Sequence, residues 1–233
     1  MKELIKEIFE KYNFSLNETQ IEQFEKYYNY LVQENEKYNL TAITQPLDVI
    51  VKHFIDSVLP EKSIEKNATV IDIGTGAGFP GIPLKILRND LKVTLLDSLQ
   101  KRINFLNNLI EILGLSNIKA FHGRAEDFVA NKREKYDYAV SRAVANLATL
   151  SEYMLPYVKV GGKAIMYKGN KLQDELQAGE NAIKILGGET EKIEKYYLAE
   201  EESNREVLII KKIKPTNKKY PRGKNLPKTK PLC

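Results

Sequence analysis

The sequence predicts an α/β protein whose mostly parallel sheet of seven strands ends in an antiparallel hairpin and follows an N-terminal helical extension. Two observations indicate this fold. From residue 68 onward, short β-branched runs alternate with longer amphipathic stretches, as in strands joined by crossover helices. Before that point, apolar residues recur at helical spacing. We expect a helical extension over 1–62, an α/β domain over 63–213 and a basic tail over 214–233.

The helical extension is predicted from a stripe of apolar residues. They recur three or four positions apart at Ile21, Phe24, Tyr28, Leu31 and Val32. The preceding segment 15–18 (SLNE) combines polar capping residues with an acid and is a suitable helix start.

Seven strands are predicted from the remaining pattern. Five of them, with helices between, are expected at 69–73, 92–97, 117–121, 136–141 and 163–168. Segments 192–198 and 206–211 flank a charged turn and indicate the closing hairpin. A helix over 99–113 should end at Gly114, and the pair Gly161-Gly162 should interrupt the chain before the fifth strand.

Composition excludes several classes of protein. The single cysteine, Cys233, cannot form an internal disulfide, and two histidines with one cysteine cannot build a typical zinc site, so we expect no metal. The start of the chain is charged in every turn, and the apolar runs are short. We therefore expect neither a signal peptide nor a membrane span, and a cytoplasmic protein.

Positive charge gathers at the end of the chain. Residues 211–233 hold nine Lys or Arg and no acid, although the whole chain carries a net charge of only +5. Such a Pro-punctuated basic segment can be a solvated, disordered end. It can also be a surface that binds the phosphates of a polyanion. The residues alone leave both interpretations open.

A glycine-rich loop follows the first predicted strand in the segment TVIDIGTGAGFPGIP, residues 69–83. Gly74, Gly76 and Gly78 can adopt backbone angles closed to other residues and let a nucleotide lie against the chain. The overlapping register 76–81 also matches a dinucleotide pattern, and Asp97 lies about twenty residues on, where that fold places a ribose-binding acid. Spacing alone does not choose between these ligands.

Residues between and beside the glycines favour S-adenosylmethionine. Pro80 and Pro83 remove N–H donors where a dinucleotide needs a helix N-terminus to bind its pyrophosphate. Asp72 would repel that phosphate, whereas it suits the cationic sulfonium of a donor without phosphate. Asp97 would then accept hydrogen bonds from the ribose hydroxyls.

Two loops later in the sequence contain further candidate ligand-binding residues. Glu126, in the segment 123–127 (GRAED) after the third strand, can accept from the adenine amino group. Arg142, in 141–143 (SRA), lies at the carboxyl edge of the sheet, where α/β folds bind ligands, and its guanidinium suits a carboxylate or a stacked base.

The sequence lacks motifs that methyltransferases need for some acceptor atoms, and this narrows the choice of acceptor. Methylation of pyrimidine carbon 5 needs a cysteine nucleophile, and Cys233 in the tail is a poor candidate. The Asn/Asp-Pro-Pro-aromatic motif used on exocyclic amines is absent. An acceptor with an exposed lone pair, such as guanine N7, remains. In RNA this atom is accessible only in a loop or in a base turned out of its stack.

Taken together, these motifs resemble the bacterial ribosomal RNA small-subunit methyltransferase G family, also called the glucose-inhibited division protein B family, over nearly the whole chain. The segments that carry the resemblance are 39–43, 53–57, 72–83, 97–98, 101–102, 105–106, 123–126, 141–145, 168–169, 220–222 and 230–232. The resemblance implies a Rossmann-like class I methyltransferase fold and methylation of N7 of a guanine in 16S ribosomal RNA, within the small ribosomal subunit, with S-adenosylmethionine as donor.

The resemblance also implies roles for individual residues. It implies cofactor contacts at Gly74, Phe79, Asp97, Ser98, Leu99, Ala125, Glu126 and Arg142, to which the glycine loop adds Gly76 and Gly78. Lys168, Arg222 and Lys224 become candidate RNA contacts. Asn39, Thr41, His53 and Asp56 either brace the helical extension or shape the acceptor pocket. No catalytic acid or base is identified, and we expect a monomer. The alternatives are a methyltransferase acting on a protein or small molecule, and a dinucleotide-binding protein.

Overall fold

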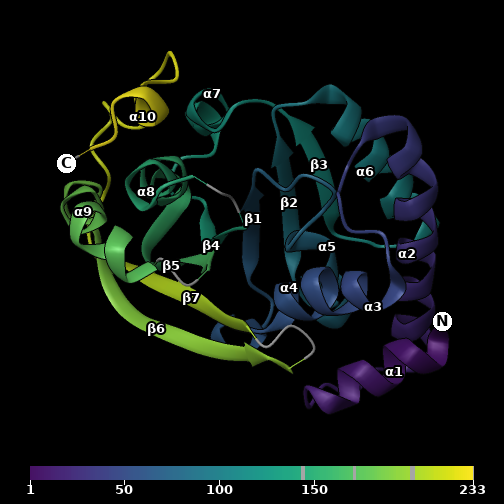
Figure 1. Cartoon of the computed structure of the whole chain (residues 1–233). Coiled ribbons are helices and arrows are strands. Elements are labelled where there is room, and N and C mark those ends of the chain that lie inside the picture. Colours follow the sequence, from purple (N-terminus) through teal and green to yellow (C-terminus); the bar gives the residue numbers. More distant parts are fainter. Residues whose placement is uncertain (143–144, 170–171, 200–202, 233) are drawn as a thin grey trace.

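A seven-stranded mixed sheet forms the centre of the protein. The computed structural model describes residues 1–142, 145–169, 172–199 and 203–232, so Ala143, Val144 and Cys233 lie outside the described residues. The strands are β1 (Thr69–Ile73), β2 (Lys92–Asp97), β3 (Ile118–His122), β4 (Tyr136–Ser141), β5 (Val158–Lys168), β6 (Gly188–Leu198) and β7 (Ser203–Lys212). Their order is β3-β2-β1-β4-β5-β7-β6 (Figure 1). Strands β1 to β5 pair in parallel, and β7 is antiparallel to both β5 and β6. The predicted fold class is confirmed.

Alternation within the strands divides the core between the two faces of the sheet. Val70 belongs to a cluster that packs under helices α5 (Gly81–Leu87) and α6 (Gln100–Ile112). Ile71 belongs to a second cluster on the opposite face. The elements that cover this opposite face are α7 (Ala125–Phe128), a 3₁₀ turn (Val129–Asn131), α8 (Leu147–Met154), a second 3₁₀ turn (Leu155–Tyr157) and α9 (Leu172–Ile185). Helices therefore cover both faces of the sheet.

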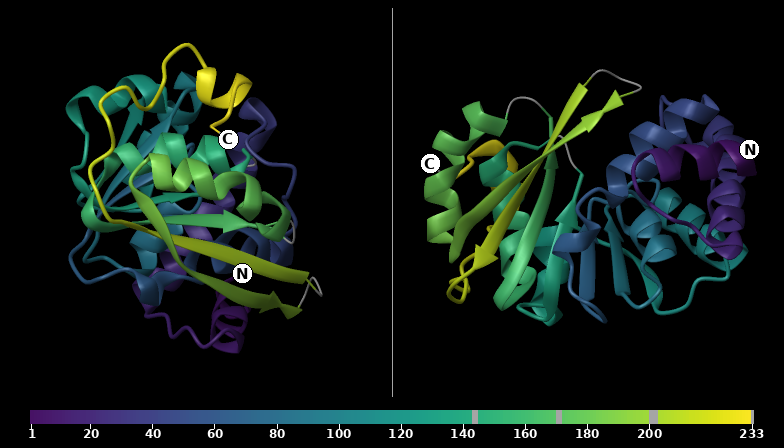
Figure 2. Two further views of the ribbon diagram at one scale, coloured as in Figure 1. Left: turned by 90° about the vertical axis from the view of Figure 1, so that its left-hand side faces the viewer. Right: turned by 90° about the horizontal axis from the view of Figure 1, so that it is seen from below.

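The helical extension packs on the α5 and α6 side. It comprises α1 (Lys2–Lys11), α2 (Glu18–Tyr38), α3 (Pro46–Val49), a π-helical segment (Ile50–Ile55), α4 (Asp56–Val58) and a 3₁₀ turn (Glu61–Ser63). The predicted helix start is confirmed, because Asn17 caps α2 in a capping box with Gln20. The side chains of Phe24, Tyr27 and Phe54 are fully buried in the same cluster as α5 and α6. These helices lie at the end of the molecule opposite α9 (Figures 1 and 2).

The fifth strand corrects one expectation. Gly161 and Gly162 were expected to interrupt the chain before it, but β5 already begins at Val158 and includes both glycines. Its pairing with β4 shifts register between Tyr136 and Tyr138. Gly161 has a φ of 90°, so the glycines allow an irregular strand instead of ending it. The hairpin strands β6 and β7 are also longer than the apolar pattern predicted, because exposed polar residues extend them.

The basic tail is folded against the α8 side of the sheet. Thr216, Tyr220 and Pro227 are buried, and a short helix, α10 (Leu226–Thr229), lies beside α8 (Figure 1). The Thr149 hydroxyl, on α8, donates a hydrogen bond to the Pro227 carbonyl at 2.7 Å. The interpretation of 211–233 as a solvated end is therefore wrong for its described part, up to residue 232, because side chains far away in sequence anchor it.

Candidate cofactor site

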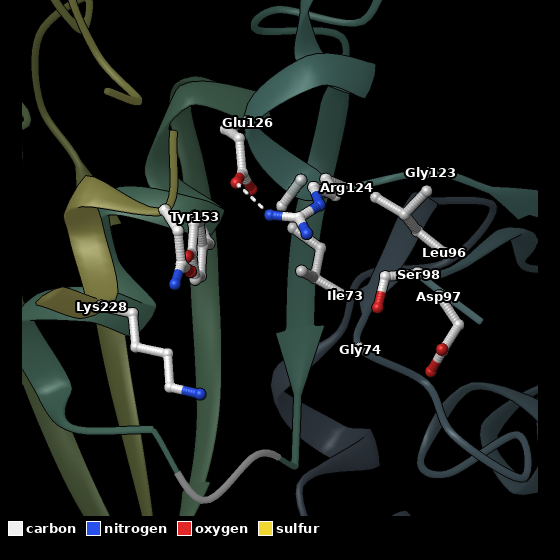
Figure 3. A pocket seen from close by; sticks show the side chains of 12 residues that line it. Ile73, Gly74, Leu96, Asp97, Ser98, Gly123, Arg124, Glu126, Tyr153 and Lys228 are labelled. Atoms are coloured by element: carbon white, nitrogen blue, oxygen red, sulfur yellow. Dashed lines mark ion pairs between the residues drawn. The ribbon is translucent and has the colours of Figure 1, made fainter. Parts of the chain in front are cut away.

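A cavity of about 360 Å³ opens at the carboxyl ends of β1, β2 and β3, where α/β folds bind nucleotides (Figure 3). Two sets of residues line it. The strand ends and the loops after them contribute Ile73, Gly74, Leu96, Asp97, Ser98, Gly123, Arg124, Ala125 and Glu126. Helix α8 contributes Tyr153, and the tail contributes Asn225 and Lys228.

The glycine loop turns sharply over the end of β1. Gly74, Gly76 and Gly78 all have positive φ values, of 73°, 61° and 103°. These angles favour glycine. At Gly78 an added Cβ would also lie 2.8 Å from the Tyr27 hydroxyl. The backbone N–H groups of Gly74 and Thr75 both donate to the Leu96 carbonyl, so the loop is bound to β2.

The N-terminus of α5, directly after this loop, has few N–H groups to offer a ligand. Pro80 and Pro83 lack an N–H, and the Ile82 N–H donates to the Gly78 carbonyl at 2.8 Å. The Gly81 N–H donates to Asp72 Oδ2 at 2.8 Å. The donors that would hold a pyrophosphate at a helix N-terminus are therefore missing or already bonded.

Contrary to the expectation from the sequence, Asp72 does not present its charge to the ligand. Its carboxyl is fully buried beneath the loop, accepts from the Thr75 hydroxyl at 2.6 Å and does not line the cavity. Burial raises the pKa of Asp72 to about 7. Asp72 therefore disfavours a phosphate by occupying the Gly81 N–H, not by presenting a charge to the ligand.

Asp97, at the end of β2, connects the loop to the cavity. Its Oδ2 accepts from the Gly76 N–H at 2.9 Å and from Arg102 at 3.1 Å, and its Oδ1 accepts from the Leu99 N–H at 3.0 Å. Arg102 also donates to Oδ1 at 3.5 Å, so all of the roughly four acceptor positions of the carboxylate are engaged, and displacement of Arg102 would free two of them. The side chain of Arg102 is one-third exposed and can move.

The far end of the cavity is formed by the segment that follows β3. The Gly123 N–H donates to the Asp97 carbonyl at 3.0 Å, and α7 begins directly afterwards at Ala125. The Glu126 side chain is only 6% exposed and lies 3.7 Å from the guanidinium of Arg124 (Figure 3). This places a carboxylate acceptor at the position predicted from the sequence.

Arg142 and Phe79 lie outside the residues that line this cavity. The Arg142 guanidinium stacks on the Phe79 ring at 4.8 Å and donates to Asp56 Oδ2 at 2.9 Å and to His53 Nδ1 at 3.1 Å. His53 stacks on the same ring at 4.5 Å, and Tyr27 packs against it at 5.3 Å. These residues form a separate aromatic cluster that joins the helical extension to the glycine loop.

Hydrogen bonds assign the tautomer of His53 within this cluster. A guanidinium can only donate, so Nδ1 accepts from Arg142 and Nε2 carries the proton. Nε2 then donates to the Thr41 hydroxyl at 2.9 Å. Burial, reinforced by Arg142, lowers the pKa of His53 to about 3. Thr41, His53 and Asp56 thus brace Arg142, and Asn39 is the left-handed C-cap of α2.

We expect acid to destabilise the protein through His53. The unfolded chain protonates this imidazole near pH 6.5, but the folded chain only near pH 3, so the stability due to neutral His53 is complete above pH 6.5 and is lost as the pH falls towards 3. Between pH 7 and 5 the loss should be about 2 kcal/mol. Urea unfolding at both pH values should therefore show a change in the free energy of unfolding, from pH 7 to 5, that is about 2 kcal/mol less favourable in the wild type than in His53→Gln.

The wild type must be compared with His53→Gln because Asp72 changes the stability with pH in the opposite direction. Its raised pKa makes its contribution to stability fall as the pH rises from 3.8 to about 7. Since His53→Gln retains Asp72, the difference between the two pH profiles isolates His53. Identical pH profiles for both proteins would show that His53 is not kept neutral by the fold.

The three candidate RNA contacts lie in different environments. Lys168 is 8% exposed, and its ammonium donates to the Ala145 carbonyl at 2.7 Å and to Glu175 at 2.6 Å. Arg222 pairs with the buried Glu152 at 2.7 Å. Lys224 is exposed. The structure therefore engages Lys168 and Arg222 within the protein and leaves Lys224 accessible.

The structure brings together half of the ten predicted cofactor residues in the cavity. Those lining it are Gly74, Asp97, Ser98, Ala125 and Glu126. Gly76 and Leu99 reach it through their hydrogen bonds to Asp97. Sequence reasoning missed the cavity-lining side chains of Tyr153, Asn225 and Lys228. The resemblance included the tail motifs on either side of Asn225 and Lys228, but nothing local indicated that they face the strand ends.

The sheet order, the bonded α5 N-terminus and the acid at the end of β2 together define a class I, S-adenosylmethionine-dependent methyltransferase. The particular family follows from sequence. A family model described as rRNA small subunit methyltransferase G matches residues 20–205, and the chain belongs to this family.

Individual relatives agree with this assignment. The chain is 50% identical to Ribosomal RNA small subunit methyltransferase G of Lactobacillus acidophilus, over 95% of each chain. It is also 50% identical to the protein of the same name from Desulforamulus reducens, over 98% of this chain and 97% of the relative.

Solved structures show the same fold at low sequence identity. A SAM-dependent methyltransferase from Aquifex aeolicus superposes with a TM-score of 0.55 at 18% identity, over 77% of this chain and 97% of that one. TYW2 of M. jannaschii, solved in complex with AdoMet, gives 0.57 at 14% identity over 74% and 80%.

Membrane-spanning helices and metal-binding clusters are both absent from the described residues. No helix there is long and apolar enough to cross a membrane. Within the same ranges, no group of three or more His, Cys, Asp or Glu side chains is placed to hold a metal ion.

Proposed function

We propose that the protein transfers the methyl group of S-adenosylmethionine to N7 of a guanine in 16S ribosomal RNA, by direct displacement. The family and the names of its relatives support ribosomal RNA of the small subunit as substrate. The single observation that carries the choice of cofactor is the N-terminus of α5, whose donors are absent or bonded to Asp72 and Gly78. A nucleotide with a pyrophosphate would find little to bind there.

The cavity residues can hold the donor in three places. Backbone at Gly74 lets the ligand approach β1, Asp97 accepts from the ribose, and Glu126 accepts from the adenine amino group. When bound, S-adenosylmethionine supplies an electrophilic methyl group on a sulfonium. The main task of the protein is then to align this group with the acceptor, which can provide most of the rate enhancement.

Guanine N7 is an acceptor that needs no general base, and the described side chains agree with this. His53 has both ring nitrogens hydrogen-bonded, and its pKa of about 3 makes it a weak base at neutral pH. The lone pair of N7 is free to attack directly. Catalysis therefore requires a turned-out base and an aligned donor, and no proton needs to be removed first.

The exposed lysines of the tail provide the charge that RNA requires. Outside the cavity, these are Lys214, Lys218, Lys219, Lys224 and Lys230. Each phosphate that they neutralise would release counterions, so binding to the subunit should weaken as salt is raised. A cytoplasmic monomer fits this role, and sedimentation of the purified protein tests its oligomeric state.

Transfer of labelled methyl groups tests the proposed function. The purified protein should label small subunits taken from cells that lack this modification, and N7-specific strand cleavage should then reveal one new site in 16S RNA. Protein-free 16S RNA, assayed in parallel, shows whether the assembled subunit is required. Label in ribosomal protein would favour the protein methyltransferase alternative, and no new cleavage site would overturn the proposal.

A further inference from the structure

One wall of the cavity comes from the tail. Tyr153 of α8, Asn225 and Lys228 face the strand ends that carry Asp97 and Ser98. Figure 3 shows the Lys228 side chain reaching into the cavity from the side opposite Asp97 and Ser98. The tail thus contributes to the same cavity that the glycine loop and the strand ends form.

Hydrogen bonds to α8 hold this wall in place. Glu152, next to Tyr153, is completely buried and accepts from the Arg222 backbone N–H at 2.7 Å and from its guanidinium at 2.9 and 2.7 Å. Arg222 also donates to the Lys230 carbonyl at 2.8 Å, on the far side of Lys228. One end of the segment that carries Lys228 is therefore bonded to the buried carboxylate, and the other end is bonded to Arg222.

Lys228 differs from the other charged residues of the cavity. Asp97 pairs with Arg102, and Glu126 pairs with Arg124. In the part of the chain that the structure describes, the Lys228 ammonium has no ion-pair partner. It is the cation of the cavity that remains available to an anionic ligand group.

We propose that residues 220–232 form a wall of the cofactor pocket and that the Lys228 ammonium binds the carboxylate of S-adenosylmethionine. Among the groups of this donor, the adenine suits Glu126 and the ribose suits Asp97. The carboxylate is the only anionic group, and an ammonium forms a strong charge-assisted hydrogen bond with it. The inference rests on the proposed use of the donor and adds a specific function for the tail.

Two ligands that differ in this carboxylate test the inference by calorimetry, without RNA. S-adenosylhomocysteine has the carboxylate, whereas 5′-methylthioadenosine has the same nucleoside without the amino acid portion. Lys228→Ala should weaken binding of S-adenosylhomocysteine about tenfold and leave binding of methylthioadenosine within about twofold. Lys228→Arg should retain the affinity of the wild type. Lys230→Ala removes an exposed lysine on the same segment outside the cavity and is the matched control.

Each other outcome has a distinct meaning. Equal weakening of both ligands would show that Lys228 contacts the nucleoside, which would overturn the carboxylate assignment. Unchanged binding of both would remove Lys228 from the pocket. If the wild type binds neither ligand, the proposed cofactor itself is wrong, and this failure is separate from a failure of the Lys228 variants alone.

Discussion

Replacing Arg222 with alanine should lower the free energy of unfolding by about 3–5 kcal/mol, because it would leave a buried carboxylate without its charged partner. Glu152 is 0% exposed, and Arg222 binds both of its oxygens. The backbone N–H of residue 222 would remain as a donor, but it cannot neutralise the charge. Urea or thermal unfolding measures this loss.

Two variants make the Arg222 prediction specific. Lys224→Ala removes an exposed cation of the same tail and should change stability by less than about 0.5 kcal/mol. The double variant Glu152→Met, Arg222→Met removes both charges and should recover most of the stability lost in Arg222→Ala. If Arg222→Ala unfolds like Lys224→Ala, the ion pair does not anchor the tail.

Replacing Asp97 with alanine should weaken binding of S-adenosylmethionine by about 2–3 kcal/mol, roughly 30- to 150-fold. The substitution removes the proposed acceptor for the ribose hydroxyls and also releases the Gly76 N–H that fixes the glycine loop. Calorimetry of cofactor binding measures the loss, and an unchanged affinity would remove Asp97 from the site.

Arg102→Ala is the control that separates these effects. It breaks the ion pair with Asp97 but leaves the carboxylate and its hydrogen bond to Gly76 in place. We expect this variant to bind the cofactor within a few-fold of the wild type. Unfolding curves of both variants at the calorimetry temperature establish that the folded protein is measured.

The sequence predicted those features that depend on neighbouring residues. The β-branched runs at 69–73 and 92–97 predicted two strands with the bounds that the structure shows, and Asn17 marked the start of α2. The glycine loop was identified because several glycines follow directly on a strand. Each of these signals is contained in a few consecutive residues, so it is visible without the fold.

Features that depend on distant residues could not be predicted. Asp97 and Lys228, on opposite walls of the cavity, lie 131 residues apart in the sequence, and Arg222 lies 70 residues from Glu152. The lysines and prolines of the tail predict a solvated segment because Glu152, which anchors the tail, lies far away in the sequence on α8. Gly161 and Gly162 were misread for a related reason: Val158 and Lys163, on either side of them, pair with the distant strand β4, so the two glycines lie within an irregular strand.

The position of Lys228 and Asn225 also determines when the site forms during synthesis of the protein. Every strand of the sheet leaves the ribosome before residues 220–232 do. The nascent chain can thus assemble its sheet and glycine loop while the cavity still lacks one side. The enzyme gains a complete pocket only after its whole sheet has been synthesised.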